Sequence, residues 1–315
     1  MLPEPLAGWI GALQGWLFQA LVLPVIQWAG LTMYTEDAFN GTEDMIYGAL
    51  EIAILVAVLL PLERRFPLEH FVRGGSVRVD IVYTAIHRLG LFPLAFFFTL
   101  RPLFDALQAW LHLHGVPTPN LEALAPALAA HAVASFAVYV VVLDFTLYWI
   151  HRAQHGFDWW WALHALHHSQ REMTFWTDNR NHLLDSVLTE SIFALVALAI
   201  GVPPAQFALL VVAPRMLESL AHANLRVSFG RLGNRLLVSP RYHRVHHAMY
   251  ASPQGDYRGA NYAVLFPCWD LLFGTADLKS PVGPTGIDDQ RSGRNYGEGF
   301  WAQQWLGLKR LAGRA

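Results

Sequence analysis

The chain contains a single cysteine, Cys268, among 315 residues. One cysteine cannot form a disulfide framework within the chain, and it excludes the thiolate metal sites that need several cysteines. Charged residues are also scarce, at 15% against 54% hydrophobic residues, a balance that soluble globular proteins seldom show. The 22 Lys and Arg are matched by 24 Asp and Glu, so the basic excess of nucleic-acid-binding proteins is missing. These absences indicate a membrane protein with lipid as its expected partner.

Several motifs of known chemistry are also missing. No Glu is followed by a His three residues later, the pattern of soluble diiron-carboxylate bundles. There is no H-E-x-x-H motif of zinc proteases, no P-loop and no G-x-G-x-x-G after a strand. The chain therefore shows no nucleotide or flavin site of its own, and redox chemistry would need electrons from a separate protein.

Long apolar segments are present instead. Residues 5–35 contain no Asp, Glu, Lys or Arg, and they exceed the roughly 20 residues needed to span the hydrocarbon core. We interpret them as an anchored helix rather than a cleaved signal peptide, because a basic n-region is missing and the apolar stretch is too long. Further apolar segments follow at 46–61, 81–100 and 127–150. The sequence therefore predicts about four transmembrane helices.

The apolar stretch 187–213 differs from the others because Gly and Pro interrupt it at residues 201–204. Each half is too short to cross a bilayer, which favours a re-entrant helical hairpin. Such a hairpin would return the chain to the face from which it entered. The segments before and after it would then meet in one compartment.

The distribution of arginines predicts an orientation. Lys and Arg in short loops favour the cytoplasmic side, so we expect the loop with Arg64, Arg65, Arg73 and Arg78 to be cytoplasmic. Four alternating spans would then also place residue 151 on the cytoplasmic side. The sequence thus predicts an all-α, multi-pass integral membrane protein whose histidine-rich segments face the cytoplasm.

We expect three parts along the chain. Residues 1–125 would be N-terminal transmembrane helices, and residues 126–278 would form the catalytic domain with the histidine clusters. The tail, 279–315, is rich in Gly, Pro and Asp and ends in a Trp- and Leu-containing stretch at 300–311. We expect this stretch to form an amphipathic or surface helix.

Eight of the fifteen histidines fall into three tight clusters. On a helix, positions i, i+3 and i+4 share one face, so each cluster can direct its imidazoles at a common centre. Imidazole suits iron and zinc, and eight nitrogens are too many for one ion. The clustered histidines, predicted to hold two metal ions, are His151, His155, His164, His167, His168, His243, His246 and His247.

Further residues near the clusters are candidate members of the site. His222 is a predicted ligand, with the Glu218 carboxylate one turn earlier placed to orient its imidazole. Asp144 lies two turns before His151 and is a candidate hydrogen-bond acceptor for it. His182 is a candidate ligand or an active-site polar residue. The competing interpretation, a polar belt at the membrane interface, would not require histidines at helical spacing.

The histidine order resembles that of the fatty acid hydroxylase superfamily, which includes sterol desaturases. The resemblance runs from about Asp144 to Thr275. It rests on H-R-x-x-H at 151–155, H-x-x-H-H at 164–168, His222 followed by Asn224, and P-x-x-H-x-x-H-H at 240–247. The stretches Asn261-Tyr262 and 269–275 (W-D-L-L-F-G-T) also look like that family's signatures. The chain departs from the family in reading Asn-Tyr-Ala at 261–263 and Arg-Asn-His-Leu-Leu-Asp at 180–185, where relatives often read N-Y-G and R-x-H-P-x-E.

The resemblance implies a helical membrane fold whose cytoplasmic cap holds two irons by histidines and uses O2 to attack an aliphatic C–H bond of a lipid or sterol-like substrate. Asp144, Glu218 and Asn224 would support the site. Electrons would come from an external donor of the ferredoxin or cytochrome b5 type with its reductase. Phe96, Phe97 and Phe98 are candidates to line a lipid path between spans.

Two rival functions remain open from sequence. A zinc-dependent membrane hydrolase could use a metal-bound hydroxide, and zinc could also replace iron in purified protein because its affinity for nitrogen sites is higher. A histidine-rich metal transporter would place its ligands within a transmembrane path. Hydroxylation and desaturation share their first step, hydrogen abstraction, so the sequence does not separate them.

Overall fold

The structure is a computed structural model that describes residues 4–70, 75–116, 120–202, 204–249 and 259–314. Side chains at 4–7, 95–102, 104–105, 129 and 204–208 lie outside this description, and so do those of Phe96, Phe97 and Phe98. Arg73 also lies outside it. Where the chain is described, it is helical and contains two isolated β-bridges but no strand.

The elements follow one another with short connections. In the first half they are α1 (Glu4–Leu17), η1 (Phe18–Val22), α2 (Leu23–Trp28), η2 (Thr32–Tyr34), α3 (Thr35–Arg65), α4 (Gly75–Arg88), α5 (Leu91–Leu113), α6 (Leu121–Leu124), α7 (Pro126–Ala129) and α8 (Ala132–Gly156). In the second half they are α9 (Asp158–His168), η3 (Thr177–Asn179), α10 (Leu183–Ala199), α11 (Pro204–His222), α12 (Gly230–Leu236), α13 (Pro240–His246), α14 (Cys268–Phe273), η4 (Asp288–Ser292) and α15 (Phe300–Leu311).

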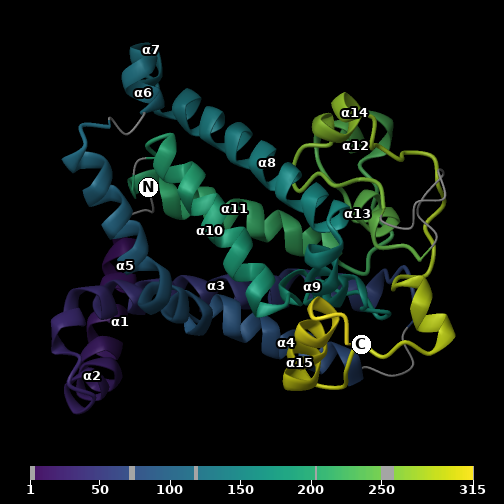
Figure 1. Cartoon of the computed structure of the whole chain (residues 1–315), viewed down its shortest axis with the longest axis horizontal. Helices are drawn as coiled ribbons and strands as arrows, with labels where there is room; N and C mark the ends of the chain where they lie inside the picture. Colours follow the sequence, from purple (N-terminus) through teal and green to yellow (C-terminus); the bar gives the residue numbers. More distant parts are fainter. Residues whose placement is uncertain (1–3, 71–74, 117–119, 203, 250–258, 315) are drawn as a thin grey trace.

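Three helical segments are long and apolar enough to cross a membrane. They are Gly8–Trp28, which runs from α1 through η1 into α2, then Thr32–Arg65 and Ala132–Gly156. Each coincides with a span predicted from sequence. Figure 1 shows α3 and α8 running from the left of the molecule toward α9, where the histidine-bearing segments gather.

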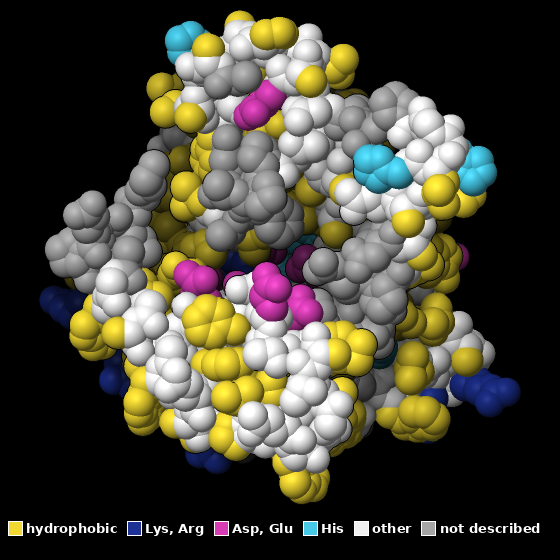
Figure 2. All heavy atoms as spheres, turned by 90° about the vertical axis from the view of Figure 1, so that its left-hand side faces the viewer, with side chains coloured by type: hydrophobic (Ala, Val, Ile, Leu, Met, Phe, Trp, Pro, Cys, Tyr) yellow, Lys and Arg dark blue, Asp and Glu magenta, His cyan; other side chains and the backbone are white. Residues whose placement is uncertain are grey.

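The left-hand face, seen in Figure 2, is dominated by hydrophobic side chains, with acidic side chains beside a central hollow.

The predicted span at 81–100 is wrong as a single helix. Helix α4 ends at Arg88 and α5 begins at Leu91, with Gly90 between them in the left-handed conformation (φ 89°). Glycine adopts this conformation without the steric cost that a Cβ atom adds, so the chain can turn sharply here. The apolar stretch is thus divided between two helices that pack against each other.

The break predicted within 187–213 is present. Helix α10 ends at Ala199 and α11 begins at Pro204, and Gly201 has a φ of 69°. Phe193 of α10 and Leu210 of α11 share a buried cluster with Tyr139 of α8. Helix α11 extends to His222, well beyond the predicted segment, and so it carries this histidine into the region of the other clusters.

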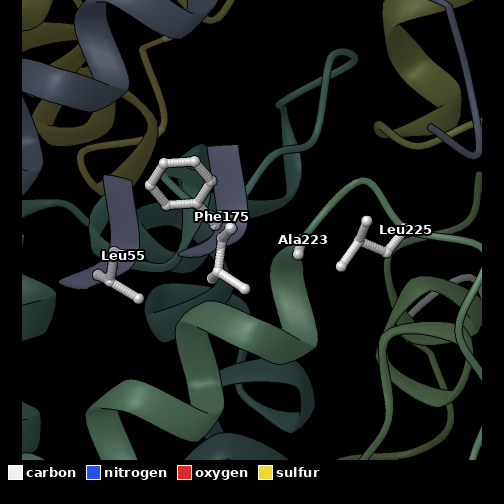
Figure 3. Packing of buried hydrophobic residues seen from close by; sticks show 5 residues of the cluster. Leu55, Phe175, Ala223 and Leu225 are labelled. Carbon is white, nitrogen blue, oxygen red and sulfur yellow. The ribbon is translucent and has the colours of Figure 1, made fainter. Parts of the chain in front are cut away.

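The end of α3 lies beside the segment that follows α11. Leu55, Phe175, Ala223 and Leu225 form a buried cluster there (Figure 3). Pro67 forms a β-bridge with Leu225, just after the arginines that end α3. The end of α3, which carries Arg64 and Arg65, therefore lies beside the segment that follows His222.

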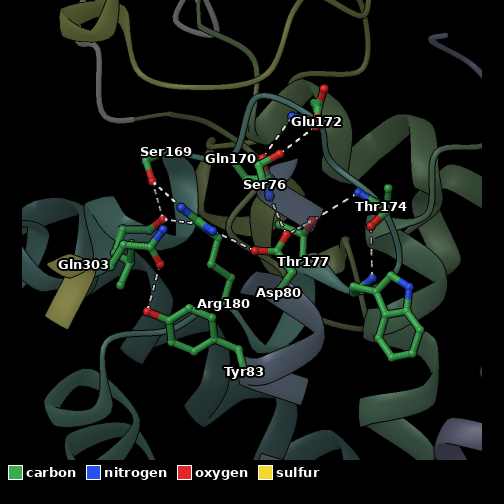
Figure 4. Close-up of polar contacts among 12 residues, drawn as sticks. Ser76, Asp80, Tyr83, Ser169, Gln170, Glu172, Thr174, Thr177, Arg180 and Gln303 are labelled. Atoms are coloured by element: carbon green, nitrogen blue, oxygen red, sulfur yellow. Dashed lines mark hydrogen bonds and ion pairs between the residues drawn. The ribbon is translucent and has the colours of Figure 1, made fainter. Parts of the chain in front are cut away.

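Buried ion pairs tie the helices to the segment between α9 and α10. The Arg88 guanidinium donates to Glu51 at 2.6 Å, to Asp178 at 2.8 Å and to Ser219 at 2.7 Å. Arg180 donates to Asp80 at 2.7 Å (Figure 4). Buried charges of this kind are tolerated only when they are paired and hydrogen-bonded. These contacts fix the loop that leads into α10 against α3, α4 and α11.

Candidate metal centre

Nine histidines from four helices converge in the interior, and all nine are buried. They include the eight clustered histidines and His222. Their ring nitrogens form two groups of four, each with all ligand atoms within 4.8 Å of one another. We call the groups centre A, which consists of His151, His155, His164 and His168, and centre B, which consists of His167, His222, His243 and His247.

Centre A is built by two consecutive helices. His151 and His155 lie in the last two turns of α8, four residues apart and therefore on one face. Helix α8 ends at Gly156, and the extended backbone of Phe157 turns the chain into α9. His164 and His168 are again four residues apart on α9, and their rings face those of α8 with centroid distances of 4.6 to 5.3 Å.

Centre B combines parts that are distant in sequence. His222 is the last residue of α11, His167 belongs to α9, and His243 and His247 lie in and directly after the short helix α13. Ser239 caps α13 by accepting from the backbone N–H of Tyr242, and Pro240 begins the helix. The His222 Nε2 lies 3.1 Å from the His167 Nε2 and 2.9 Å from the His243 Nε2. The Nε2 atoms of His243 and His247 are 3.1 Å apart.

His246 joins the two centres. Its ring nitrogen forms a third group with those of His168 and His247, one residue from each centre. Its ring centroid is 4.5 Å from that of His151 and 4.7 Å from that of His168. The two centres are thus adjacent rather than independent.

Four imidazoles are oriented by a hydrogen bond at the outer nitrogen Nδ1. The acceptors are the Tyr262 carbonyl for His151 at 2.8 Å, the Glu218 carbonyl for His222 at 2.8 Å, the Ala260 carbonyl for His246 at 2.7 Å, and the Asp185 carboxylate for His164 at 3.0 Å. An acceptor at Nδ1 places the proton there and leaves the Nε2 lone pair free for a metal.

The carbonyls that hold His151 and His246 belong to one buried loop. Asp270 fixes this loop by accepting from the backbone N–H of Tyr262 at 2.9 Å and of Ala263 at 2.8 Å. It also accepts from Thr275 and Tyr242. The W-D-L-L-F-G-T stretch therefore acts through Asp270, which folds the loop that orients the histidines.

Asp144 supports the same loop and does not contact His151. Its carboxylate accepts from the backbone N–H of Leu265 at 2.9 Å and of Phe266 at 3.1 Å, and from the Trp269 indole at 2.8 Å. The predicted direct bond from Asp144 to His151 is therefore wrong. The helical spacing placed both residues on one face of α8, but the loop lies over Asp144 and supplies the backbone carbonyl of Tyr262 instead.

Asp185 is the carboxylate that sequence reasoning missed. It lies in the first turn of α10 and accepts from the Trp160 indole and the Gln154 amide, each at 2.7 Å, as well as from His164. Trp160 and His164 are one turn apart on α9. The signal that could have identified it was its place in the stretch 180–185, where Asp185 stands at the acidic position of R-x-H-P-x-E.

His182 does not join either centre. Its Nε2 bonds to the Gln304 carbonyl at 2.9 Å, and its Nδ1 accepts from the backbone N–H of Leu184 at 3.1 Å. Both ring nitrogens are occupied, so the structure gives His182 the role of capping α10 rather than binding metal. The sequence could not separate these roles because both place a histidine directly before a helix.

Glu218 and Asn224 also differ from expectation. The backbone carbonyl of Glu218, and not its carboxylate, orients His222. The side-chain amide of Asn224 donates to the Glu69 carbonyl at 2.8 Å and accepts from the Glu69 N–H at 3.1 Å. Asn224 therefore fastens the segment after α11 to the loop after α3 and makes no contact with the histidines.

The protonation of the cluster suits a metal. Burial lowers the pKa of His246 to about 3, and burial together with neighbouring imidazoles lowers the pKa values of His167, His168, His243 and His247 well below 6.5. Among the described residues, the buried Nε2 atoms of His164, His168 and His246 have no hydrogen-bond partner. Unsatisfied buried nitrogens are costly, and a metal ion would satisfy them. The donor set therefore fits metal ions held by neutral imidazoles.

A cavity of about 360 Å³ reaches centre A. His155, His168 and His246 form one part of its wall, and Trp161 and Met249 form another. Segment 286–292, which includes η4, also lines it. This volume is many times that of a water molecule, so O2 and part of a larger molecule can approach the histidines.

Comparisons with known proteins agree with this site. Residues 136–275 match the model of the fatty acid hydroxylase family. The chain is 26% identical over 288 residues to the ornithine lipid hydroxylase OlsE of Rhizobium tropici, a match that covers 90% of this chain and 82% of the relative. It is 31% identical over 140 residues to human alkylglycerol monooxygenase, covering 44% of this chain and 29% of that enzyme.

A third relative is the fatty acid hydroxylase vlmA of a Lecanicillium species, at 27% identity over 49% of this chain and 45% of the relative. No solved structure matches the chain significantly. The family match contains all nine converging histidines, and it lies within the expected part 126–278. The histidine order, the buried site and the relatives agree in identifying residues 136–275 as a fatty acid hydroxylase domain.

Proposed function

We propose that this protein is a membrane-bound, O2-dependent diiron oxidoreductase that hydroxylates or desaturates an aliphatic C–H position of a lipid or sterol-like substrate. The observation that carries the proposal is the pair of adjacent four-histidine centres joined by His246. Its relatives include a hydroxylase of ornithine lipids and monooxygenases of alkylglycerols. Two iron ions at these centres would supply the electron transfer and O2 activation that the reaction needs.

The chemistry of the relatives favours iron over zinc. Imidazole nitrogens bind both metals. Zinc has no redox chemistry, whereas the relatives found by comparison are hydroxylases and monooxygenases. An oxidation by O2 needs a redox-active metal, and iron would supply that chemistry at these centres.

The chain's own residues would bind and enclose the substrate. Trp161, Met249 and Ile287 form an apolar part of the cavity wall at centre A, against which a hydrocarbon would pack, and Asp288, Asp289 and Ser292 form a polar part. A hydroxylation adds one oxygen atom of O2 to the C–H bond, while two electrons and two protons reduce the other oxygen atom to water. The electrons would come from a ferredoxin- or cytochrome b5-type donor with its reductase.

The location of the ligands favours an enzyme over a transporter. His151 and His155 lie in the last two turns of the candidate span α8, at its end rather than along its length. A transport path would place ligands in sequence across the membrane. We propose further that the end of the molecule that holds the histidines faces the cytoplasm, because the arginines that end α3 lie beside the segment after His222.

The test uses iron-reconstituted protein in nanodiscs with a reductase system, followed by mass spectrometry of a broad lipid panel. We expect O2-dependent products that gain one oxygen or lose two hydrogens. Iron content is measured on the same samples. Two bound irons without any O2-dependent lipid change would contradict the proposed reaction, and a hydrolytic product without O2 would favour the zinc hydrolase.

A further inference from the structure

Helix α15 has its polar residues inside and its apolar residues outside. Its buried residues recur at helical spacing and are mostly polar: Gln303, Gln304, Gly307 and Arg310. On the opposite face, Trp301 is 78% exposed, Trp305 is 59% exposed, and Leu308 is also exposed. A helix on a water-covered surface shows the reverse pattern. The outward face of α15 is therefore suited to lipid rather than to water.

The surroundings of α15 connect this face to the apolar part of the molecule. The helix packs against α9 and α4, as Figure 1 shows. The ring centroids of Phe300 and Tyr83 are 4.8 Å apart. Leu184, in the first turn of the apolar helix α10, is exposed. The Lys309 ammonium lies 5.8 Å from the Trp305 ring centroid. Tryptophans with a neighbouring cation are typical of the headgroup layer of a bilayer.

The inner face of α15 is bonded to the segment that begins α10. The Gln304 carbonyl accepts from the His182 Nε2 at 2.9 Å. The side-chain oxygen of Gln304 accepts from the Leu183 N–H at 2.8 Å, and the side-chain amide of Gln304 donates to the Tyr83 hydroxyl at 2.9 Å. Gln303 accepts from the same hydroxyl at 3.0 Å (Figure 4). Two glutamines thus hold α15 to α4 and to the start of α10.

Gly307 permits this close approach. A Cβ atom at this position would lie 2.3 Å from the His182 Cδ2, so no side chain fits without moving the helix or the ring. One turn later, the Arg310 Nε donates to the Ala162 carbonyl on α9 at 3.2 Å. Ala162 precedes the centre A residue His164 by two positions.

The contacts lead from α15 to centre A. His182 caps α10 through the Leu184 N–H, and Asp185 in the same first turn holds the His164 Nδ1. Displacing the His182 ring would shift the first turn of α10 and with it the Asp185 carboxylate. A carboxylate that orients a ligand imidazole raises metal affinity about 10- to 100-fold.

We propose that α15 lies in the headgroup layer of the bilayer, with Trp301 and Trp305 against lipid, and from there positions centre A through His182 and Asp185. Residues 300–311 lie outside the family match, so this support is separate from the segment that carries the histidines. The inference rests on the two-metal centre of the proposed function. Its tests use metal binding and membrane depth rather than turnover.

The first experiment measures the depth of α15. In a Cys268→Ser background, Trp301→Cys is labelled with a nitrobenzoxadiazole fluorophore, and the protein is placed in nanodiscs of phosphatidylcholine and phosphatidylglycerol. We expect stronger quenching by spin-labelled lipids than by aqueous iodide. Glu298→Cys, exposed just before the helix, should show the opposite order. Quenching of the Trp301→Cys label by iodide alone would overturn the bilayer placement.

The second experiment titrates metal-free protein in nanodiscs with Co²⁺ and follows its visible absorption. Wild type should bind two equivalents, and Gly307→Ala should bind one of them 10- to 100-fold more weakly, with an altered spectrum for that centre. Gly41→Ala is the matched control because it lies within α3 and a Cβ there meets nothing within 4 Å. Both variants are compared by thermal unfolding to verify that they fold.

Gln304→Leu provides a second variant that removes hydrogen bonds without adding bulk at His182. If α15 positions centre A, Gln304→Leu should lower the affinity for the same equivalent of Co²⁺. Wild-type affinity at both sites in folded Gly307→Ala and Gln304→Leu proteins would overturn this inference while leaving the proposed function intact. Failure of wild type to bind two equivalents would instead contradict the proposed function.

Discussion

Centres A and B use the same ligand type but are supported differently. In centre A, the outer nitrogens of His151 and His164 are bonded to the Tyr262 carbonyl and to the Asp185 carboxylate. In centre B, the outer nitrogen of His222 is bonded to a carbonyl of its own helix. The buried Nδ1 atoms of the other three residues have no hydrogen-bond partner in the described part of the chain: His167, His243 and His247.

This difference suggests separate ways of holding imidazoles in place. Centre A depends on hydrogen bonds from α10 and from the loop that Asp270 folds. Centre B depends on packing of its imidazole rings against one another, with ring centroids 4.2 to 5.1 Å apart. We therefore expect centre A to respond to changes in its surroundings and centre B to respond mainly to changes in its own ligands or in the position of α11.

The largest effect should come from the ligands next to the junction. His168→Ala and His247→Ala each remove one member of a four-histidine centre and one member of the group with His246. We expect both to abolish activity and to lower the metal stoichiometry while the protein still inserts into membranes. Inductively coupled plasma mass spectrometry of purified protein checks this, and wild-type iron content in both variants would refute the ligand assignment.

Arg88→Met should act on centre B through α11. Arg88 donates to Ser219, three residues before His222, and pairs with Glu51 and Asp178. Its loss leaves the two buried carboxylates without the cation that pairs with them, which costs about 3–5 kcal/mol. We expect a lower stability in chemical unfolding and weaker metal binding at centre B than at centre A. The exposed Arg231→Met is the control, and equal stability of the two variants would contradict this account.

Asp185→Asn should weaken centre A alone. An amide keeps the shape of the carboxylate, but it loses the charge and one acceptor, and it presents a donor toward the His164 or Trp160 N–H. We expect one equivalent of metal to bind 10- to 100-fold more weakly in a Co²⁺ titration. A loss that falls equally on both equivalents would show that the centres are not supported separately.

Glu218→Gln should have the smallest effect. The backbone carbonyl of this residue orients His222, and that carbonyl remains in the variant. We expect metal affinity at centre B to stay within about twofold of wild type, given that each orienting contact contributes about tenfold or more. A tenfold loss of metal affinity in the same titration would show that the Glu218 carboxylate orients His222, as predicted from sequence.

Features that depend on residues close together in the chain could be predicted from the sequence, and features that depend on residues far apart in the chain could not. Helical spacing identified the eight clustered histidines, because residues three and four apart on a helix share a face wherever that helix is placed. The same local rule suggested that Asp144 would support His151. It could not show that the backbone N–H groups of a loop more than 100 residues later would donate to the Asp144 carboxylate.

Helix boundaries show a similar division. Apolar length predicted the spans that coincide with α3 and α8, because the thickness of the bilayer sets a required length. The span at 81–100 was wrong because apolar length alone does not show the break between two helices at Gly90. The stretch 300–311 was expected to be a surface helix, and α15 forms there, but its sequence did not reveal which of its two faces would point outward.

The sequence by itself determined that imidazoles would gather in periodic clusters within a membrane protein, because composition and helical spacing are local properties. Only the tertiary structure decided how they are shared: the neighbours His167 and His168 belong to different centres, and His182 caps α10 under Gly307. Adjacent helical residues point about 100° apart, so each can serve a different centre only when other helices bring partners to both sides. That arrangement depends on contacts between segments far apart in the chain.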